Sequence, residues 1–163
     1  IVTESSTEES FAKFIQTYPG SSYIDTAWRE IYQAFLADYS IDRISEFLNN
    51  YASTPLKDYI IRHQAVESEV YLPFSIDEKY GFMKLNGAPL REPDFEYVGF
   101  FNEGLAPVVK NGKFGFVNKL MEIQIPCLYE SVSEYINGRS IVELNGKFGL
   151  LDRNGRYMLE CKS

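Results

Sequence analysis

The chain has 163 residues, of which 45% are apolar and 24% charged, and its formal net charge is −7. This composition is typical of a globular protein with enough sequence for a sizeable core, and it excludes a mostly disordered chain.

The charge is concentrated in the first part of the chain, where residues 1–70 hold 11 acids and 5 bases. No apolar run reaches the length of about 18 residues that a membrane span needs. We therefore expect no membrane insertion and no nucleic-acid partner, because nucleic acids need clustered Lys and Arg. The acidic surface is either simply solvated or a docking site for a basic partner.

Residues 1–70 are predicted to form four helices, the first two separated by a Pro-Gly turn. Apolar residues recur at helical spacing from Phe11 to Tyr18, and Pro19 with Gly20 ends that stretch. The second helix carries a continuous apolar stripe opposite charged residues, so we expect the stripe to face a core. The stripe consists of Ile24, Ala27, Trp28, Ile31, Ala34 and Phe35.

The third and fourth predicted helices repeat the pattern of the first two. Pro55 is predicted to be the first residue of a fourth helix that runs to about Val70. One shift along the chain aligns Phe14 with Phe47, and a Tyr follows each of them four residues later. This pattern resembles the tetratricopeptide-like repeats of bacterial envelope lipoproteins, over about residues 8–70. The resemblance implies two helical hairpins.

The second half of the chain contains a short pattern three times: Lys, an aromatic residue, Gly and an apolar residue. The aromatic and glycine positions of the three copies are Tyr80 and Gly81, Phe114 and Gly115, and Phe148 and Gly149. The period is about 34 residues, which indicates stacked units, none of which can bury its apolar face alone. We call the displacement by one period, from Gly81 to Gly115, the repeat shift. We therefore predict an α+β chain, with a helical region at 1–70 and an antiparallel β array of about three repeats at 71–163.

Each repeat is predicted to contain a tight β-hairpin. Asn-Gly pairs at 111–112 and 145–146 separate two apolar runs, and Asn-Gly favours a type I′ turn, which needs positive φ at both central residues. The repeated Gly lies in the second strand, where we expect the next unit to approach closely. A further turn ends at Gly87 and at Gly155. Met121 replaces this Gly in the middle copy, so we expect a distorted or longer turn there.

These residues carry a family resemblance. The repeated pattern, the turn, the apolar run and the segment from Phe101 to Val108 resemble the bacterial WG repeat family, also called KWG repeats, over about residues 71–160. The resemblance implies a β-rich array used for interaction and no chemistry common to the family. The Trp of the family is absent. Tyr80, Phe114 and Phe148 occupy the positions of this Trp. They keep a large ring for packing, but they lack the indole N–H donor.

Residues with a possible chemical role are few. His63 is the only histidine, and we interpret it as a packed, hydrogen-bonded side chain. Cys127 and Cys161 are separated by one repeat shift, so they occupy equivalent places, and whether a disulfide joins them stays open. The sequence contains no Gly-rich phosphate loop, no Cys-x-x-Cys pair and no Gly-x-Ser-x-Gly motif. We therefore predict no catalytic residue, no metal and no cofactor.

Aromatic residues are numerous, with 12 Tyr, 12 Phe and one Trp. One interpretation is that the rings of the β array fill its core, because short strands offer little aliphatic depth. The other is that some rings form exposed platforms for a glycan or a peptide. The candidate ligand-facing residues are Tyr97, Phe100 and Tyr129.

Three functions follow from these observations. We favour a non-catalytic protein-interaction scaffold in a bacterium, whose partner is a protein or peptide. The alternative is a carbohydrate or cell-wall binding module that uses aromatic residues of the array. A third, an enzyme fragment or its regulatory part, has no mechanism in the sequence. Because the chain opens at Ile1, we expect a trimmed product with its targeting segment upstream, located in the cell envelope or periplasm in preference to the cytoplasm.

Overall fold

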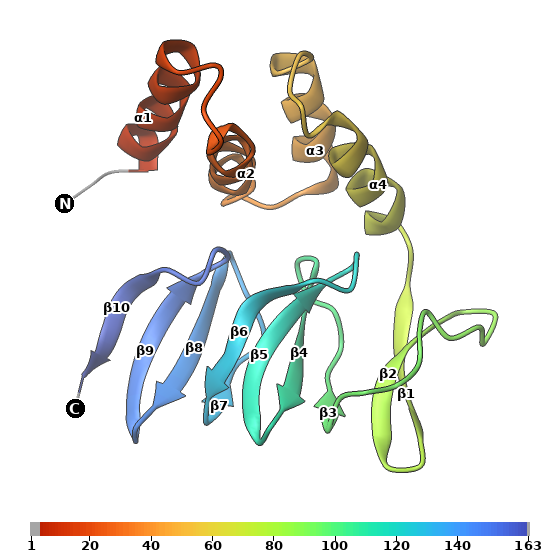
Figure 1. Cartoon of the computed structure of the whole chain (residues 1–163). Coiled ribbons are helices and arrows are strands. Elements are labelled where there is room, and N and C mark those ends of the chain that lie inside the picture. Colours follow the sequence, from red (N-terminus) through yellow and green to blue (C-terminus); the bar gives the residue numbers. More distant parts are fainter. Residues whose placement is uncertain (1–3, 163) are drawn as a thin grey trace. The chain divides into compact units, whose positions relative to one another are not determined.

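The computed structural model describes the backbone of residues 4–162 and the side chains of residues 9–162. The chain divides into two compact units, Ile1–Ala65 and Val66–Ser163. The first, which we call the helical unit, is composed of helices, and the second, the β unit, of antiparallel sheets (Figure 1). The predicted α+β class, with helices before the β repeats, is confirmed.

The helical unit follows the expected order, with corrections at the fourth helix. The four helices are α1 (Glu4–Thr17), α2 (Ile24–Phe35), α3 (Ile41–Asn50) and α4 (Lys57–Glu67). The hydroxyl of Ser40 caps α3 by accepting a hydrogen bond from the Arg43 N–H at 3.3 Å. Pro55 is not the first residue of α4, because the helix begins two residues after Pro55 and the Ile60 N–H donates to the Leu56 carbonyl at its start. The helix also ends before Val70.

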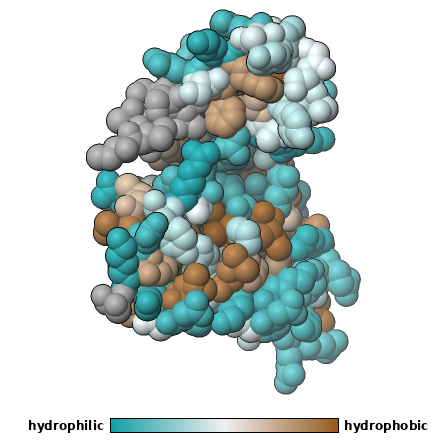
Figure 2. Space-filling view, turned by 60° about the vertical axis from the view of Figure 1, so that its left-hand side comes forward, coloured by the Kyte–Doolittle hydropathy of each residue, from teal (hydrophilic) through white to brown (hydrophobic). Residues whose placement is uncertain are grey.

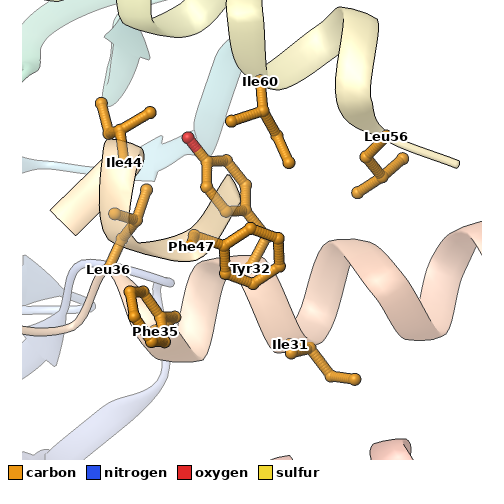
Figure 3. Close-up of a cluster of buried hydrophobic side chains, with 8 residues drawn as sticks. All are labelled: Ile31, Tyr32, Phe35, Leu36, Ile44, Phe47, Leu56 and Ile60. Carbon is orange, nitrogen blue, oxygen red and sulfur yellow. The ribbon is translucent and has the colours of Figure 1, made fainter. Parts of the chain in front are cut away.

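Among the described residues of the helical unit, one cluster of buried apolar side chains forms the core (Figure 3). It consists of Ile31, Tyr32, Phe35, Leu36, Ile44, Phe47, Leu56 and Ile60. Tyr32 is fully buried, its ring centroid lies 4.9 Å from that of Phe47, and its hydroxyl is 2.6 Å from Nδ1 of His63. The predicted stripe of α2 omitted Tyr32, since a hydroxyl is buried only where it finds a partner. His63 is that partner, and its interpretation as a packed, hydrogen-bonded histidine is confirmed.

The β unit contains three antiparallel sheets in chain order (Figure 1). Its strands are β1 (Tyr71–Ile76), β2 (Lys79–Lys84), β3 (Tyr97–Val98), β4 (Leu105–Lys110), β5 (Lys113–Asn118), β6 (Ile123–Tyr129), β7 (Ser131–Val132), β8 (Arg139–Leu144), β9 (Lys147–Asp152) and β10 (Tyr157–Lys162). The first sheet pairs β1 with β2. The second has the order β3-β4-β5-β6 and the third the order β7-β8-β9-β10, so each is a meander around one hairpin.

The hairpins turn as the Asn-Gly pairs predict. At residues 111–112 the two φ angles are 54° and 70°, as a type I′ turn requires. The first copy makes the same turn with Asp77 and Glu78, at φ 50° and 63°. The expectation of a distorted turn at Met121 is wrong. Met121 adopts φ 62° and donates its N–H to the Asn118 carbonyl at 3.0 Å, as Gly155 does to Asp152 at 3.1 Å.

A further tight turn occurs in two of the repeats and was not predicted from the sequence. Glu103 and Gly104 have φ angles of 50° and 75°, and Asn137 and Gly138 have 51° and 73°. In both repeats the residues that flank the turn exchange two backbone hydrogen bonds. Strands β4 and β8 begin directly after these turns. The Asn-Gly pair at 137–138 carries the type I′ signature and could have indicated them.

The sheets are joined by segments that leave one sheet and enter the next. β6 pairs with β5 in the second sheet, and β7 follows after one residue and pairs with β8 in the third. The carboxylate of the residue between them, Glu130, accepts a hydrogen bond from the N–H of Gly146 in the next hairpin turn, at 3.2 Å. Glu96 makes the same contact with Gly112 at 2.9 Å. Because of these links, each hairpin is fixed to the segment that precedes it.

Two cores lie between the three sheets, and they are copies of each other. The first inter-sheet core consists of Tyr71, Phe82, Phe95, Val98, Ala106, Val108 and Val117. The second consists of Leu105, Phe116, Ile125, Tyr129, Tyr135, Val142 and Leu151. The repeat shift converts most of the first set into the second, for example Phe82 into Phe116. Each core takes one face from a hairpin and the opposite face from the next, as stacked units require.

The repeated glycines do lie where another backbone approaches, but it is not that of the next unit. A Cβ on Gly115 would meet the carbonyl oxygen of Ile125 and lie 2.8 Å from the Cys127 nitrogen, both in the adjacent strand β6. The pairing of β5 with β6 is irregular at this point, so the strand bulges over the glycine. Gly149 is covered in the same way by β10. The expectation that the next unit packs here is therefore corrected.

Candidate functional site

Two of the three candidate ligand-facing rings are exposed and one is not. Tyr97 is 46% exposed and Phe100 62%, and both lie on the segment that enters the second sheet. Tyr129 is only 5% exposed and belongs to the second inter-sheet core. Its expected role as a ligand-facing residue is therefore wrong, and the alternative that rings of the array fill its core holds for it. Tyr129 is the repeat equivalent of Phe95, which is buried in the same way.

Tyr97 is the centre of a short row of rings. Its ring centroid lies 6.3 Å from that of Tyr80 and 6.1 Å from that of Phe114. Tyr80 and Phe114 are the aromatic positions of the repeated pattern, and both are partly buried. The row therefore connects two repeats. It is not continued at Phe148, because the position equivalent to Tyr97 in the next repeat is a serine.

Phe100 stands at a cavity of about 210 Å³ in the β unit. The cavity is lined by Glu69, Val70, Tyr71, Leu72, Phe100, Phe101 and Lys119. Tyr71 is buried and its ring packs edge-on against Phe101, with centroids 6.1 Å apart, so these walls are fixed by the first inter-sheet core. Phe100, by contrast, is exposed at the rim.

Lys119 closes one side of this cavity and is held in place. Its ammonium group donates hydrogen bonds to the carbonyl oxygens of Glu67 at 2.6 Å and Glu69 at 2.7 Å. Burial lowers the pKa of Lys119, while the carboxylates of Glu67 and Glu69 oppose that change. Arg153, one repeat shift later, donates in the same way to the Glu103 carbonyl at 2.7 Å. Lys119 and Arg153 thus each bind the backbone of a segment that precedes their own repeat. The two basic residues are separated by one repeat shift, and this spacing could have predicted that they share a role.

Glu67 is the buried acid of this region. Burial raises its pKa to about 7, although the nearby charges of Lys119 and Arg153 act in the opposite direction. The side chain is only 4% exposed. The carboxyl group therefore changes its charge near neutral pH beside the wall of the cavity.

The helical unit has an apolar groove of its own. Its volume is about 440 Å³, and it lies between α1 and α2. Its lining residues are Ser10, Phe11, Phe14, Tyr23, Thr26 and Ala27. Tyr23 is 67% exposed, so a large ring stands at the edge of the groove. Sequence reasoning placed Phe11 and Phe14 on the apolar side of a helix and did not identify this surface.

The described part of the chain offers little for chemistry. Cys127 and Cys161 are both free thiols, and burial raises the pKa of Cys127. Among the residues that the structure describes, His, Cys, Asp and Glu side chains form no cluster of three or more that could hold a metal ion. Within the same residues, no helix has the length and apolar character needed to cross a membrane. What the arrangement can do is receive apolar groups, in the cavity at Phe100 and in the groove between α1 and α2.

The comparison with protein families identifies the repeat. Residues 80–114 and 114–148 each match the model of the WG containing repeat. The C-terminal half of the chain carries WG repeats. Each matched segment begins and ends at an aromatic position of the repeated pattern, and the first includes both Tyr97 and Phe100. The comparisons with curated proteins and with solved structures gave no match.

The WG repeat assignment explains the order of the sheets. One matched segment, 80–114, starts in β2 and ends in β5, so it contains the second strand of one hairpin and the first strand of the next. A WG repeat of this chain is therefore a step from one sheet to the following one. The resemblance of residues 8–70 to tetratricopeptide-like repeats stays a prediction.

Proposed function

We propose that this repeat protein is a non-catalytic scaffold that binds other proteins, and that the cavity at Phe100 receives an apolar side chain of the partner. The observation that carries the proposal is an exposed Phe100 over a cavity with fixed aromatic walls, Tyr71 and Phe101. Binding energy in protein interfaces is concentrated in such pockets, where an aromatic or aliphatic anchor is fully desolvated.

The size of the cavity supports a side chain over a small molecule. Its 210 Å³ is below the range of about 300–1,000 Å³ that is typical of pockets for small ligands and cofactors. Among the described residues that line it, Glu69 and Lys119 are the charged ones, and Lys119 already donates to two carbonyl groups. The groove of the helical unit offers a second apolar surface, suited to an amphipathic helix.

The test is a selection of phage-displayed random peptides against the immobilised chain, with fragments of peptidoglycan and a glycan array as parallel probes. Selected peptides should share a large apolar residue, and Phe100→Ala should weaken their binding at least about ten-fold, which corresponds to about 1.4 kcal/mol. Ile136→Ala is the matched control, because Ile136 is also exposed, at 65%, and does not line the cavity. Peptides that bind both variants as well as the parent chain would contradict the role of the cavity.

A carbohydrate-binding module is the second candidate, favoured by the row of rings at Tyr97. An exposed Tyr between Tyr80 and Phe114 presents an apolar face with a polar tip, as sugar platforms do. If this candidate holds, the chain is retained by glycans or peptidoglycan, and Tyr97→Ala abolishes the retention while Phe100→Ala leaves it unchanged. Retention that Tyr97→Ala does not alter would remove the candidate.

A further inference from the structure

An apolar surface is exposed on the third sheet of the β unit. Ile141, Leu150 and Leu159 are register partners on β8, β9 and β10, so their side chains form one row on one face of the sheet. Ile141 is 53% exposed and Leu159 66%, and beside this row Phe148 is 60% exposed. Figure 2, in which the β10 side of Figure 1 is turned forward, shows apolar side chains at the surface of the β unit. We call this surface the β8–β10 face.

The same face of the second sheet is covered. The residues equivalent to this row are Pro107, Phe116 and Ile125, and all three are buried, with Phe116 at 0% and Ile125 at 1% exposure. The cover is the third sheet together with the segment that joins β7 to β8, whose Tyr135 ring lies 4.7 Å from that of Phe116, centroid to centroid. The first sheet repeats the contact, with Phe82 2% exposed and its ring centroid 4.8 Å from that of Phe101. The β8–β10 face is therefore one half of an interface that the molecule forms twice.

The other half of that interface is present on the first sheet. Leu72, Phe74, Ile76 and Met83 lie on the face of β1 and β2 that is turned away from the first inter-sheet core. Ile76 is 53% exposed and the others are partly buried. The equivalents of Leu72, Phe74 and Met83 in the second sheet are Ala106, Val108 and Val117, which are fully buried against the first, whereas Ile76 corresponds to the exposed Lys110. We call this surface the β1–β2 face.

We propose that two copies of this chain associate head to tail, with the β8–β10 face of one copy packed on the β1–β2 face of the other. The contact continues the repeat-to-repeat packing across two molecules, with the same strands and equivalent residues in the same roles. Both faces expose apolar side chains, and contiguous apolar surface of this kind marks a site where another unit packs. When a contact joins two different faces, a dimer still has one free face of each kind. Further copies therefore add to it, and association proceeds to closed rings or open filaments.

Sedimentation of the whole chain over a range of concentrations provides the test. We expect the average mass to rise past that of a dimer as the concentration increases. Leu159→Lys or Ile141→Lys on the β8–β10 face, and Met83→Glu on the β1–β2 face, should each leave only monomers, because every contact needs both faces. Leu159 and Ile141 are more than half exposed and Met83 is partly buried on the outer face of its sheet, so the variants should remain folded, which circular dichroism will verify.

Mixing provides the decisive outcome. A one-to-one mixture of the Leu159→Lys and Met83→Glu variants retains one intact face of each kind, so it should form a dimer and no larger species. Leu128→Lys is the control, because Leu128 is 56% exposed but lies in the second sheet, and it should associate like the parent chain. A parent chain that stays monomeric would overturn the proposal. So would a Met83→Glu variant that dimerises alone, since that result indicates a symmetric contact between two β8–β10 faces.

Discussion

The cores inside the two units of this protein are organised in different ways. The helical unit has one core, and its central contact joins Tyr32 and His63, two residues that occur in no second copy. The β unit has two cores that are related by the repeat shift. Phe82 and Phe116 are equivalent members of these cores, and their neighbours are residues of similar type. In a repeat, a contact seen once predicts the next one. In the helical unit the contact between Tyr32 and His63 occurs once and has no counterpart in the other hairpin.

The largest effect is expected from a substitution that the bulged strands forbid. In Gly115→Val the new side chain would collide with the backbone of β6 at Ile125 and Cys127, which is fixed by its pairing with β5. We expect the free energy of unfolding of the β unit to fall by about 4 kcal/mol or more, measured by chemical denaturation followed by far-ultraviolet circular dichroism. Gly20→Val in the helical unit is the control, because a Cβ there meets nothing within 4 Å. Similar losses in both variants would contradict the account.

Truncation of a core ring should have the next largest effect. Phe116→Ala and Phe82→Ala remove equivalent rings from the two inter-sheet cores, and each should lower the free energy of unfolding by about 3–5 kcal/mol. Phe100→Ala should lower it by less than about 1 kcal/mol, since its ring is 62% exposed. A loss at Phe100 as large as at Phe116 would show that Phe100 belongs to the core and not to a binding surface.

Glu67 should make the stability of the β unit depend on pH. Its pKa in the folded state, about 7, lies above the ordinary value, so the folded state favours the protonated carboxyl group. The stabilisation is complete below the ordinary value and is lost as the pH rises towards 7 and above. Between pH 4 and pH 8 we expect a loss of about 2–3 kcal/mol in the parent chain.

The control for this pH dependence is a pair of amide variants. Glu67→Gln cannot ionise, so the loss of stability should be absent from its denaturation series. Glu69→Gln, at an exposed position two residues later, should retain it. A Glu67→Gln chain with the full pH dependence of the parent would assign the effect to another group.

A smaller loss of stability is expected from the contact between Tyr32 and His63 in the helical unit. Tyr32→Phe removes the hydroxyl that pairs with Nδ1 of the buried His63, which leaves a polar atom without this partner. We expect a loss of about 1–2 kcal/mol. Trp28 is the only tryptophan and packs against the core of the helical unit, so its fluorescence reports this transition separately. An unchanged transition would show that the pair contributes nothing to stability.

The same difference between the units explains how much the sequence could predict. In the β unit, the fixed period and the Asn-Gly pairs predicted the repeats, the hairpins and their order, because each feature occurs in several copies. The abundance of rings alone could not predict which of them are exposed. Tyr129 and Phe100 lie on similar stretches of sequence, but only Tyr129 coincides with a buried ring, Phe95, after the repeat shift. The recurrence of an aromatic residue at these two positions is visible in the sequence, and it indicates a core position.

The remaining features depend on contacts between residues far apart in the chain. Lys119 reaches carbonyl groups about 50 residues earlier, and the cavity at Phe100 is formed by residues from three separate segments. Met121 adopts positive φ because its neighbours in the first inter-sheet core and its hydrogen bond to Asn118 fix the turn. Local propensity alone predicts the opposite.

The central claim is that each WG repeat packs only on the sheets beside it, and a double-mutant cycle tests it most directly. Phe116 and Tyr135 meet across the second inter-sheet core, so the unfolding free energies of the two single variants and the double variant to Ala should reveal a coupling of about 0.5–1.5 kcal/mol. Phe82 and Tyr135 lie in different cores, so their effects should be additive within about 0.5 kcal/mol. A coupled control pair, or no coupling between Phe116 and Tyr135, would contradict the account.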